Sequence, residues 1–162
     1  MSKLPHHDDD AHYVRLYGRW NIKHHSPNQM GAMELVREID GINIITTNGK
    51  EALASLLYSG TVTATTNTFK YMAIGTGAGA ESAAGTTLGT EAARHTGTVS
   101  YVSGAIYQVS ATFATGIGTG AIVEYGLFNS SSAGTMFSRD LENVINKGAS
   151  DTLTATLQIT LS

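Results

Sequence analysis

Histidine and aspartate side chains gather near the N-terminus, in the run HHDDDAH from His6 to His12. Imidazole and carboxylate groups are the ligands that zinc and other transition metals take in proteins. A specific metal site, however, draws its ligands from separate rigid elements, and adjacent residues of one segment rarely converge on one ion. We therefore predict no metal site and interpret this run as a polar segment, whose histidines would titrate near neutral pH.

Three glycines, Gly75, Gly77 and Gly79, follow a predicted strand and invite comparison with a dinucleotide-binding loop. That fingerprint requires Gly-x-Gly-x-x-Gly at the start of a helix. Here Ala80 stands at the third glycine position, and no long amphipathic helix follows it. The pattern predicts a flexible loop and no nucleotide cofactor.

Serines and carboxylates give no better case for catalysis. The serine run at 130–132 lacks the Gly-x-Ser-x-Gly elbow of a nucleophile, and His95 has no partner at metal-ligand spacing, so we interpret it as a strand-end residue. Asp140 and Glu142 fall on one side of a possible short strand, where we expect a solvated edge that resists strand addition. We predict that the protein is not an enzyme and has no catalytic residue, metal or cofactor.

The composition excludes several classes of partner. Charged residues make up 14 % of the 162 residues, against about 25 % in an average soluble domain, which favours surfaces covered by neighbouring subunits. The formal net charge is −3 and no segment is strongly basic, so nucleic acid is not an expected partner. No apolar run is long enough to span a membrane or to serve as a signal-peptide core, and cysteine is absent.

The elements that would position a site begin with one helix. Asn48, followed three residues later by Glu51, is typical of a capped helix start, and the apolar residues of 52–57 repeat at helical spacing. Beyond it, glycine-rich turns separate runs of strand-like sequence. We predict strands at 68–74, 96–102, 105–114, 121–128, 135–139 and 152–161, and the last has the strictest alternation of apolar and polar residues.

The clearest local pattern is a hairpin over residues 105–129. Apolar residues alternate from Tyr107 to Phe113, and Gly116, Gly118 and Gly120 then supply the positive φ angles that a reversal needs. Residues 121–128 are expected to pair back antiparallel. Several strands without crossover helices favour a mainly β body, an antiparallel β-sandwich or jelly roll, over a parallel α/β sheet.

Residues 1–40 fit neither a helical nor a strand period well. We predict an extended N-terminal arm over 1–40 and a β-sandwich body over 41–162, with 30–39 as a short helix or irregular connector. Large apolar residues with flanking arginines suit contact with a partner surface. The predicted partner-binding residues are Tyr13, Arg15, Leu16, Tyr17, Arg19 and Trp20. The alternative is that 13–22 forms an ordinary first strand.

Four segments together resemble small structural proteins of tailed bacteriophages. They read YMAIGTGAGAESAAGTTLGTEAAR (71–94), GTGAIVEYGLFN (118–129), GTMFSRD (134–140) and KGASDTLTATLQITLS (147–162). In that group a capped helix like NGKEALASLL (48–57) comes first, then a strand with a glycine-rich loop and a TxLGTE…R segment. The resemblance covers about residues 42–162, and its short motifs recur across decoration, tail and fibre proteins.

The resemblance implies a non-enzymatic β-domain that works in a symmetric virion assembly. We expect a capsid decoration or cement protein that bridges neighbouring subunits of the major capsid protein, with localisation in the virion. Low charge and small polar strands suit a homotrimer. The alternative function is a tail fibre, collar or baseplate adaptor, and the fold also permits a carbohydrate-binding module, which the single Trp20 supports little.

Overall fold

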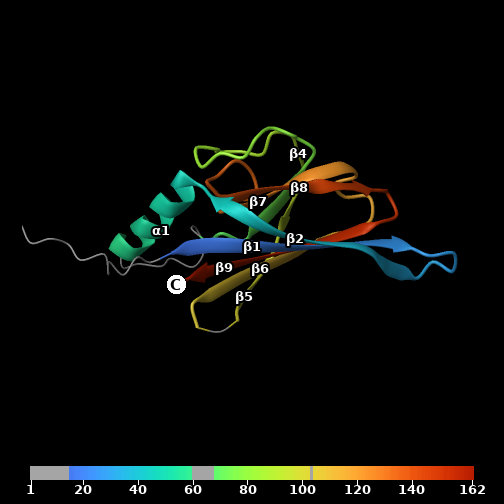
Figure 1. The fold of residues 1–162 in the computed structure, drawn as a ribbon, viewed down its shortest axis with the longest axis horizontal. Coiled ribbons are helices and arrows are strands. Elements are labelled where there is room, and N and C mark those ends of the chain that lie inside the picture. The colour runs from blue at the N-terminus through green and yellow to red at the C-terminus, as the bar shows by residue number, and fades with distance from the viewer. Residues whose placement is uncertain (1–14, 60–67, 103) are drawn as a thin grey trace, which may run out of the picture.

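The computed structural model describes residues 15–59, 68–102 and 104–162 and places nine strands and one helix in them. In chain order the elements are β1 (Leu16–Pro27), β2 (Met33–Ile45), α1 (Thr47–Ser59), β3 (Tyr71–Gly75), β4 (Glu91–Thr96), β5 (Thr98–Tyr101), β6 (Ile106–Phe113), β7 (Gly120–Phe128), β8 (Met136–Lys147) and β9 (Thr152–Leu161). Figure 1 shows a rolled sheet with α1 at one end and the β1–β2 hairpin at the other.

The strands form one antiparallel sheet in the order β4-β3-β7-β8-β2-β1-β9-β6-β5. The two edge strands, β4 and β5, are separated in the chain by Gly97 alone, so one bent segment joins both edges. A Cβ atom at Gly97 would lie 2.5 Å from a Val109 methyl carbon, and the Gly97 N–H donates to the Lys70 carbonyl at 2.6 Å. Glycine thus permits the close approach that nearly closes the sheet into a barrel.

Large apolar side chains fill the interior of the rolled sheet. On β9 every second residue from Leu153 to Ile159 is buried, as the alternating sequence predicts, and the intervening threonines face outward. The largest apolar side chains with less than 2 % exposure are Trp20, Tyr125, Phe113, Phe128, Ile22, Met72, Ile74, Ile122, Leu127, Met136 and Ile145. The prediction of a mainly β, antiparallel body with one short helix is confirmed, and the sandwich or jelly-roll arrangement stays a prediction.

The predicted hairpin over 105–129 is wrong in its pairing. β6 pairs with β5 and β9, whereas β7 pairs with β3 and β8. The glycines do adopt positive φ angles, +76° at Gly116, +61° at Gly118 and +133° at Gly120. The turn therefore forms where the sequence predicts it, but it carries the chain across the barrel from one half of the sheet to the other.

The predicted arm over 1–40 is also wrong for the residues that the structure describes. β1 lies inside the sheet, between β2 and β9, and Trp20 on it is completely buried. Residues 30–39, predicted as a helix or connector, contribute the turn after β1 and the first half of β2. The alternative prediction, a first strand, is correct from Leu16 onward. Because β1 and β2 fill the centre of the sheet, the division at residue 40 does not separate two domains.

Helix α1 forms where predicted, with a different capping residue. The Thr46 hydroxyl oxygen accepts the Gly49 N–H at 2.9 Å and donates to the Met136 carbonyl at 2.5 Å, so Thr46 rather than Asn48 caps the helix. An added Cβ at Gly49 would lie 2.4 Å from the Phe137 carbonyl oxygen. The first turn is therefore fixed against β8. In the described part of the chain, no helix is long and apolar enough to cross a membrane.

Candidate functional site

The β1–β2 hairpin projects beyond the rest of the sheet (Figure 1). β2 pairs with β8 only at Ile44 and Ile45, so the earlier part of β2 has β1 as its one strand neighbour. Residues 29–38 are all exposed, and strand alternation is lost there. We call residues 28–36 the hairpin tip. Its exposed apolar side chains are Met30 at 90 %, Met33 at 41 %, Leu35 at 49 % and Val36 at 55 %.

Asn28 organises the turn of the hairpin tip. Its side-chain oxygen accepts the N–H groups of Met30 and Ala32 at 2.9 and 3.0 Å, and its amide nitrogen donates to Glu34 at 2.7 Å. Gly31 takes the positive φ, +82°, that this turn requires. The backbone that carries the exposed apolar residues is therefore ordered by contacts within the hairpin itself.

Asp151 fastens the base of the hairpin to the β8–β9 turn. Its carboxylate accepts from the Ser26 hydroxyl and the Gly148 N–H, both at 2.7 Å, and His24 Nε2 lies 2.8 Å away. Burial alone would raise the pKa of Asp151, but these hydrogen bonds and the His24 charge outweigh it and lower the pKa to about 2. Lys147 donates to the Asp151 carbonyl at 2.9 Å. These contacts of Asp151, which we call the Asp151 latch, fix the base of the projecting hairpin to the body.

The outer face of β2, β1, β9 and β6 is an open polar surface. Register places Gln108, Gln158 and Arg19 in one row across three strands. A groove of about 340 Å³ on this face is lined by Arg19, Asn21, Lys23, Glu38, Asp40, Gln108, Thr156 and Gln158. Several of these groups bond one another, including Gln158 to Gln108 and Asn21 to Glu38, each at 2.7–2.8 Å. We call it the polar face.

The structure divides the predicted partner-binding residues between this face and the core. Tyr17 is 49 % exposed, and Arg15 and Arg19 are exposed, so these three remain available to a partner. Trp20 is wrong as a surface anchor, since its ring lies 5.8 Å from the Tyr125 ring in the core. Leu16 is half-buried and packs against the core. Tyr13, like the His6–His12 run, lies outside the described residues.

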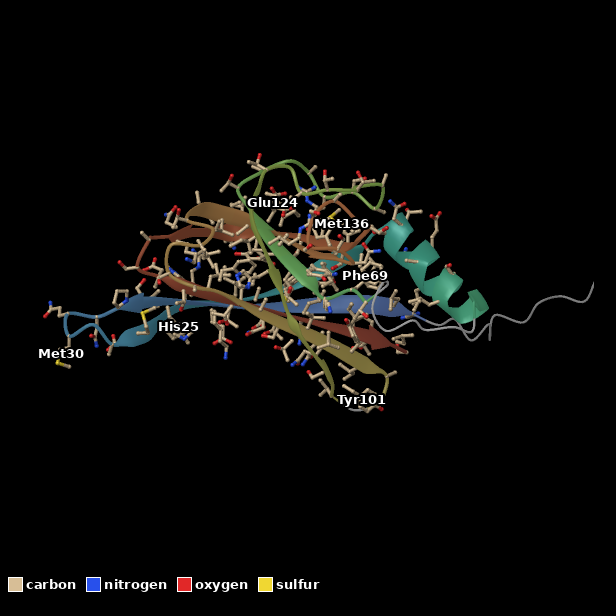
Figure 2. All side chains as sticks on the ribbon, turned by 180° about the vertical axis from the view of Figure 1, so that it is seen from behind. His25, Met30, Phe69, Tyr101, Glu124 and Met136 are labelled. Atoms are coloured by element: carbon tan, nitrogen blue, oxygen red, sulfur yellow. The ribbon has the colours of Figure 1, made fainter. Side chains whose placement is uncertain are left out.

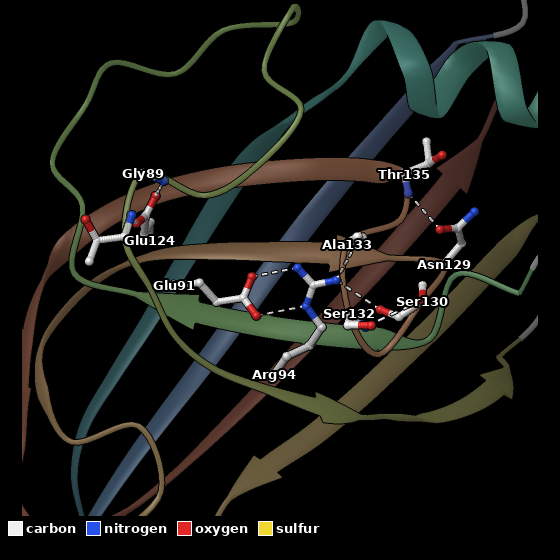
Figure 3. Close-up of polar contacts among 10 residues, drawn as sticks. Gly89, Glu91, Arg94, Glu124, Asn129, Ser130, Ser132, Ala133 and Thr135 are labelled. Carbon is white, nitrogen blue, oxygen red and sulfur yellow. Dashed lines mark hydrogen bonds and ion pairs between the residues drawn. The ribbon is translucent and has the colours of Figure 1, made fainter.

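The glycine loop between β3 and β4 surrounds a buried carboxylate of the chain itself. Glu124, with no exposed surface, accepts the N–H groups of Gly77, Gly89 and Thr90 at 2.7–2.8 Å and the Arg139 guanidinium at 2.9 Å (the Gly89 contact is drawn in Figure 3). Burial would raise its pKa, but the three backbone donors and Arg139 hold the pKa below the ordinary value. Sequence analysis missed this site, which we call the Glu124 clasp.

The loop that contains the serine run is held by Arg94. Its guanidinium forms two bonds with Glu91, at 2.6 and 2.9 Å, and donates to the Ser130 and Ala133 carbonyls at 3.0 and 2.7 Å (Figure 3). It also stacks 3.6 Å from the Phe128 ring centroid. Arg94 therefore binds the serine loop through backbone carbonyl groups, which gives this loop a structural role.

Asp140 is buried, contrary to the predicted solvated edge, because β8 is an interior strand of the sheet. Its side chain is near Glu142 and close to Gly41 of β2, and one of its oxygens has no hydrogen-bond partner in the described structure. Burial, with the nearby charges of Glu142 and Glu81, raises the pKa of Asp140 to about 7. The charged form is therefore unfavourable in the fold.

Asp140→Asn is expected to stabilise the protein at pH 8 and to leave it unchanged near pH 4. The carboxyl titrates near 3.8 when unfolded and at about 7 when folded, so the native state binds the extra proton between these values and stability falls as the pH rises through them. We expect a gain of up to about 4 kcal/mol at pH 8, since the pKa rises by about three units on folding and each unit is worth about 1.4 kcal/mol. Urea unfolding at both pH values measures it. Asp40→Asn, on the exposed polar face, is the control, and equal effects of both variants would contradict the prediction.

Among the described residues, no group of three or more histidine, aspartate or glutamate side chains is placed to hold a metal ion. Comparison with known proteins adds no identity: no protein-family model, no curated protein and no solved structure matches the chain. The hairpin tip, with its exposed apolar side chains, is the candidate functional site. Its sequence signal is Asn28 and Gly31 between two strand-length runs, a turn pattern that could have predicted the hairpin.

Proposed function

We propose that the protein is a non-enzymatic structural subunit of a bacteriophage virion, a capsid decoration protein that bridges subunits of the major capsid protein. The observation that carries this proposal is the projecting, pre-organised hairpin with apolar residues exposed on a fastened base. An isolated protein gains nothing from such a surface, whereas an assembled subunit buries it. The resemblance to small phage structural proteins supplies the virion context.

The energetics of the hairpin tip suit attachment. Fully burying one Met, Leu or Val side chain contributes about 1.5–3 kcal/mol, and the tip exposes four such residues on a turn already ordered by Asn28. A rigid tip also loses little conformational entropy on binding. Because many copies would bind one symmetric particle, a modest free energy per contact adds up over the whole particle. The exposed Tyr17 and Arg19 on the polar face offer a second surface, which we assign to the major capsid protein.

Three charged clusters of the described interior hold loops or the hairpin in place, which supports a structural role. Glu124 and Arg139 hold the glycine loop, Arg94 holds the serine loop, and Asp151 holds the hairpin. The two halves of the rolled sheet share one core, which supports a sandwich-like or jelly-roll-like body. A homotrimer at local threefold positions remains part of the proposal.

Copy number in purified virions tests the proposed function. Quantitative mass spectrometry should find the protein at close to the copy number of the major capsid protein, because decoration follows the capsid lattice. Imaging of the same particles should place its density on the head. A few copies, in multiples of three or six, would instead assign it to the tail as a fibre, collar or baseplate adaptor. Its absence from purified virions would overturn the structural role altogether.

A further inference from the structure

A second exposed apolar surface lies at the far end of β1 from the hairpin tip. It is a shallow recess of about 290 Å³ lined by Val99, Ser100, Tyr101, Ala105, Ile106, Tyr107 and Leu161, which we call the β5–β6 recess. Tyr101 is 75 % exposed, and Val99 and Leu161 are more than one-third exposed. The recess therefore offers a concave apolar surface where the tip offers a convex one.

The hairpin tip cannot enter the recess of its own chain. Leu16, at the start of β1, pairs with Leu161 beside the recess, whereas Pro27, at its end, pairs with Met33 in the tip. The strand between them spans 12 residues, which is about 36 Å at roughly 3.3 Å per residue. Figure 2 shows Met30 and Tyr101 well separated on the molecule. A tip that fills such a recess must therefore come from another molecule.

We propose that the hairpin tip of one copy docks in the β5–β6 recess of a second copy, in a head-to-tail contact. Both surfaces are apolar, and one projects while the other is hollow. Opposite charges flank the two surfaces: Glu34 lies on the tip, and Arg15, exposed on the polar face, bonds through its backbone to Ser162, next to Leu161 at the rim of the recess. The inference names a neighbour for the proposed virion subunit and rests on that proposal only for its biological setting.

A head-to-tail contact determines how the copies assemble. Each pair leaves one tip and one recess free, so addition continues until the copies close into a ring or extend as a filament. The Asp151 latch fixes the base of the hairpin to the body. A hairpin fixed in this way gives the same rotation at each contact, as a closed ring such as the predicted trimer requires.

Sedimentation velocity on the full-length protein from micromolar to millimolar concentration tests the contact. The wild type should associate, and Leu35→Glu in the tip and Tyr101→Glu in the recess should each weaken association at least about tenfold, because either places a charge in an apolar interface. Ile42→Glu is the matched control: Ile42 is 73 % exposed on the polar face, outside both surfaces. Circular dichroism checks the fold, and Leu161→Glu is the second recess variant should Tyr101→Glu unfold.

Mixing the two variants identifies the geometry. Leu35→Glu keeps its recess and Tyr101→Glu keeps its tip, so an equimolar mixture should form a 1:1 complex that does not grow. A wild type that stays monomeric, a mixture that stays monomeric, or variants that associate like the wild type would each overturn the head-to-tail contact. These results are distinct from the virion test: a monomer found at capsid copy number would remove the contact and leave the proposed function standing.

Discussion

Trp20→Ala is expected to lower the free energy of unfolding by about 3–5 kcal/mol, the range for removing a large aromatic side chain from a packed core. Trp20 has no exposed surface and packs beside Tyr125 on a strand that is bonded on both sides. The loss is a large share of the stability of about 5–15 kcal/mol that a domain usually has. Urea unfolding followed by circular dichroism measures it.

Tyr17→Ala is the matched control, because Tyr17 lies on the same strand with half of its surface exposed. A surface substitution of this kind should change stability by less than about 0.5 kcal/mol. If Trp20→Ala left the fold as stable as Tyr17→Ala does, Trp20 would not be a core residue. The N-terminal strand would then have to be a separable arm after all.

Sequence analysis gave the first strand only as the alternative to an arm, because the buried face of this strand is not uniformly apolar. Leu16, Trp20 and Ile22 alternate correctly, but Gly18 and His24 occupy the same face. Gly18 leaves room for the Asn43 side chain, since an added Cβ would lie 2.2 Å from the Asn43 amide oxygen. His24 is buried by its contact with Asp151, 127 residues away. Neither reason can be read from the neighbouring sequence.

Local signals were reliable where the structure depends on local chemistry. The alternation of β9, the helix at 47–59 and the positive φ angles at 116–120 depend on nearby residues, and each was predictable. Strand pairing depends on which distant strand completes the barrel. β6 and β7 follow one another in the sequence, and the glycines between them suit a hairpin turn. The two strands nevertheless pair with other strands, because the sheet rolls up and its two edges are joined through Gly97.

The glycine loop at 75–79 was predicted to be flexible and to bind no nucleotide, whereas the structure shows its backbone bonded to an anion of the chain itself. Glycines let backbone N–H groups converge on an anion, which is why the pattern invites comparison with a phosphate-binding loop. Here Gly75 and Gly77 leave space for Glu124, whose oxygen would lie 2.5–2.6 Å from an added Cβ. The anion is a carboxylate supplied 47 residues later in the chain, so only the fold could identify it.

Glu124→Gln is expected to destabilise the protein by about 3–5 kcal/mol, as for the loss of one partner of a buried ion pair. Glutamine retains the shape but offers one acceptor oxygen and an N–H₂ group, so it cannot receive three backbone N–H groups and Arg139 together. Arg139 would remain buried without its counter-charge. Hydrogen exchange at Gly77, Gly89 and Thr90 should accelerate together with the fall in stability.

Glu91→Gln separates this effect from the general loss of a carboxylate. Glu91 pairs with Arg94 nearer the surface, with one-third of its side chain exposed, so its loss should cost no more than about 1 kcal/mol.

The pH dependence of stability gives a second readout of the role of Glu124. Because the pKa of Glu124 is lowered in the fold, its stabilisation is present above the ordinary value of 4.5 and is lost as the pH falls through the lowered pKa. The difference between wild type and Glu124→Gln should therefore narrow in acid; a constant difference, or unchanged exchange at the three amides, would mean that the carboxylate does not hold the loop.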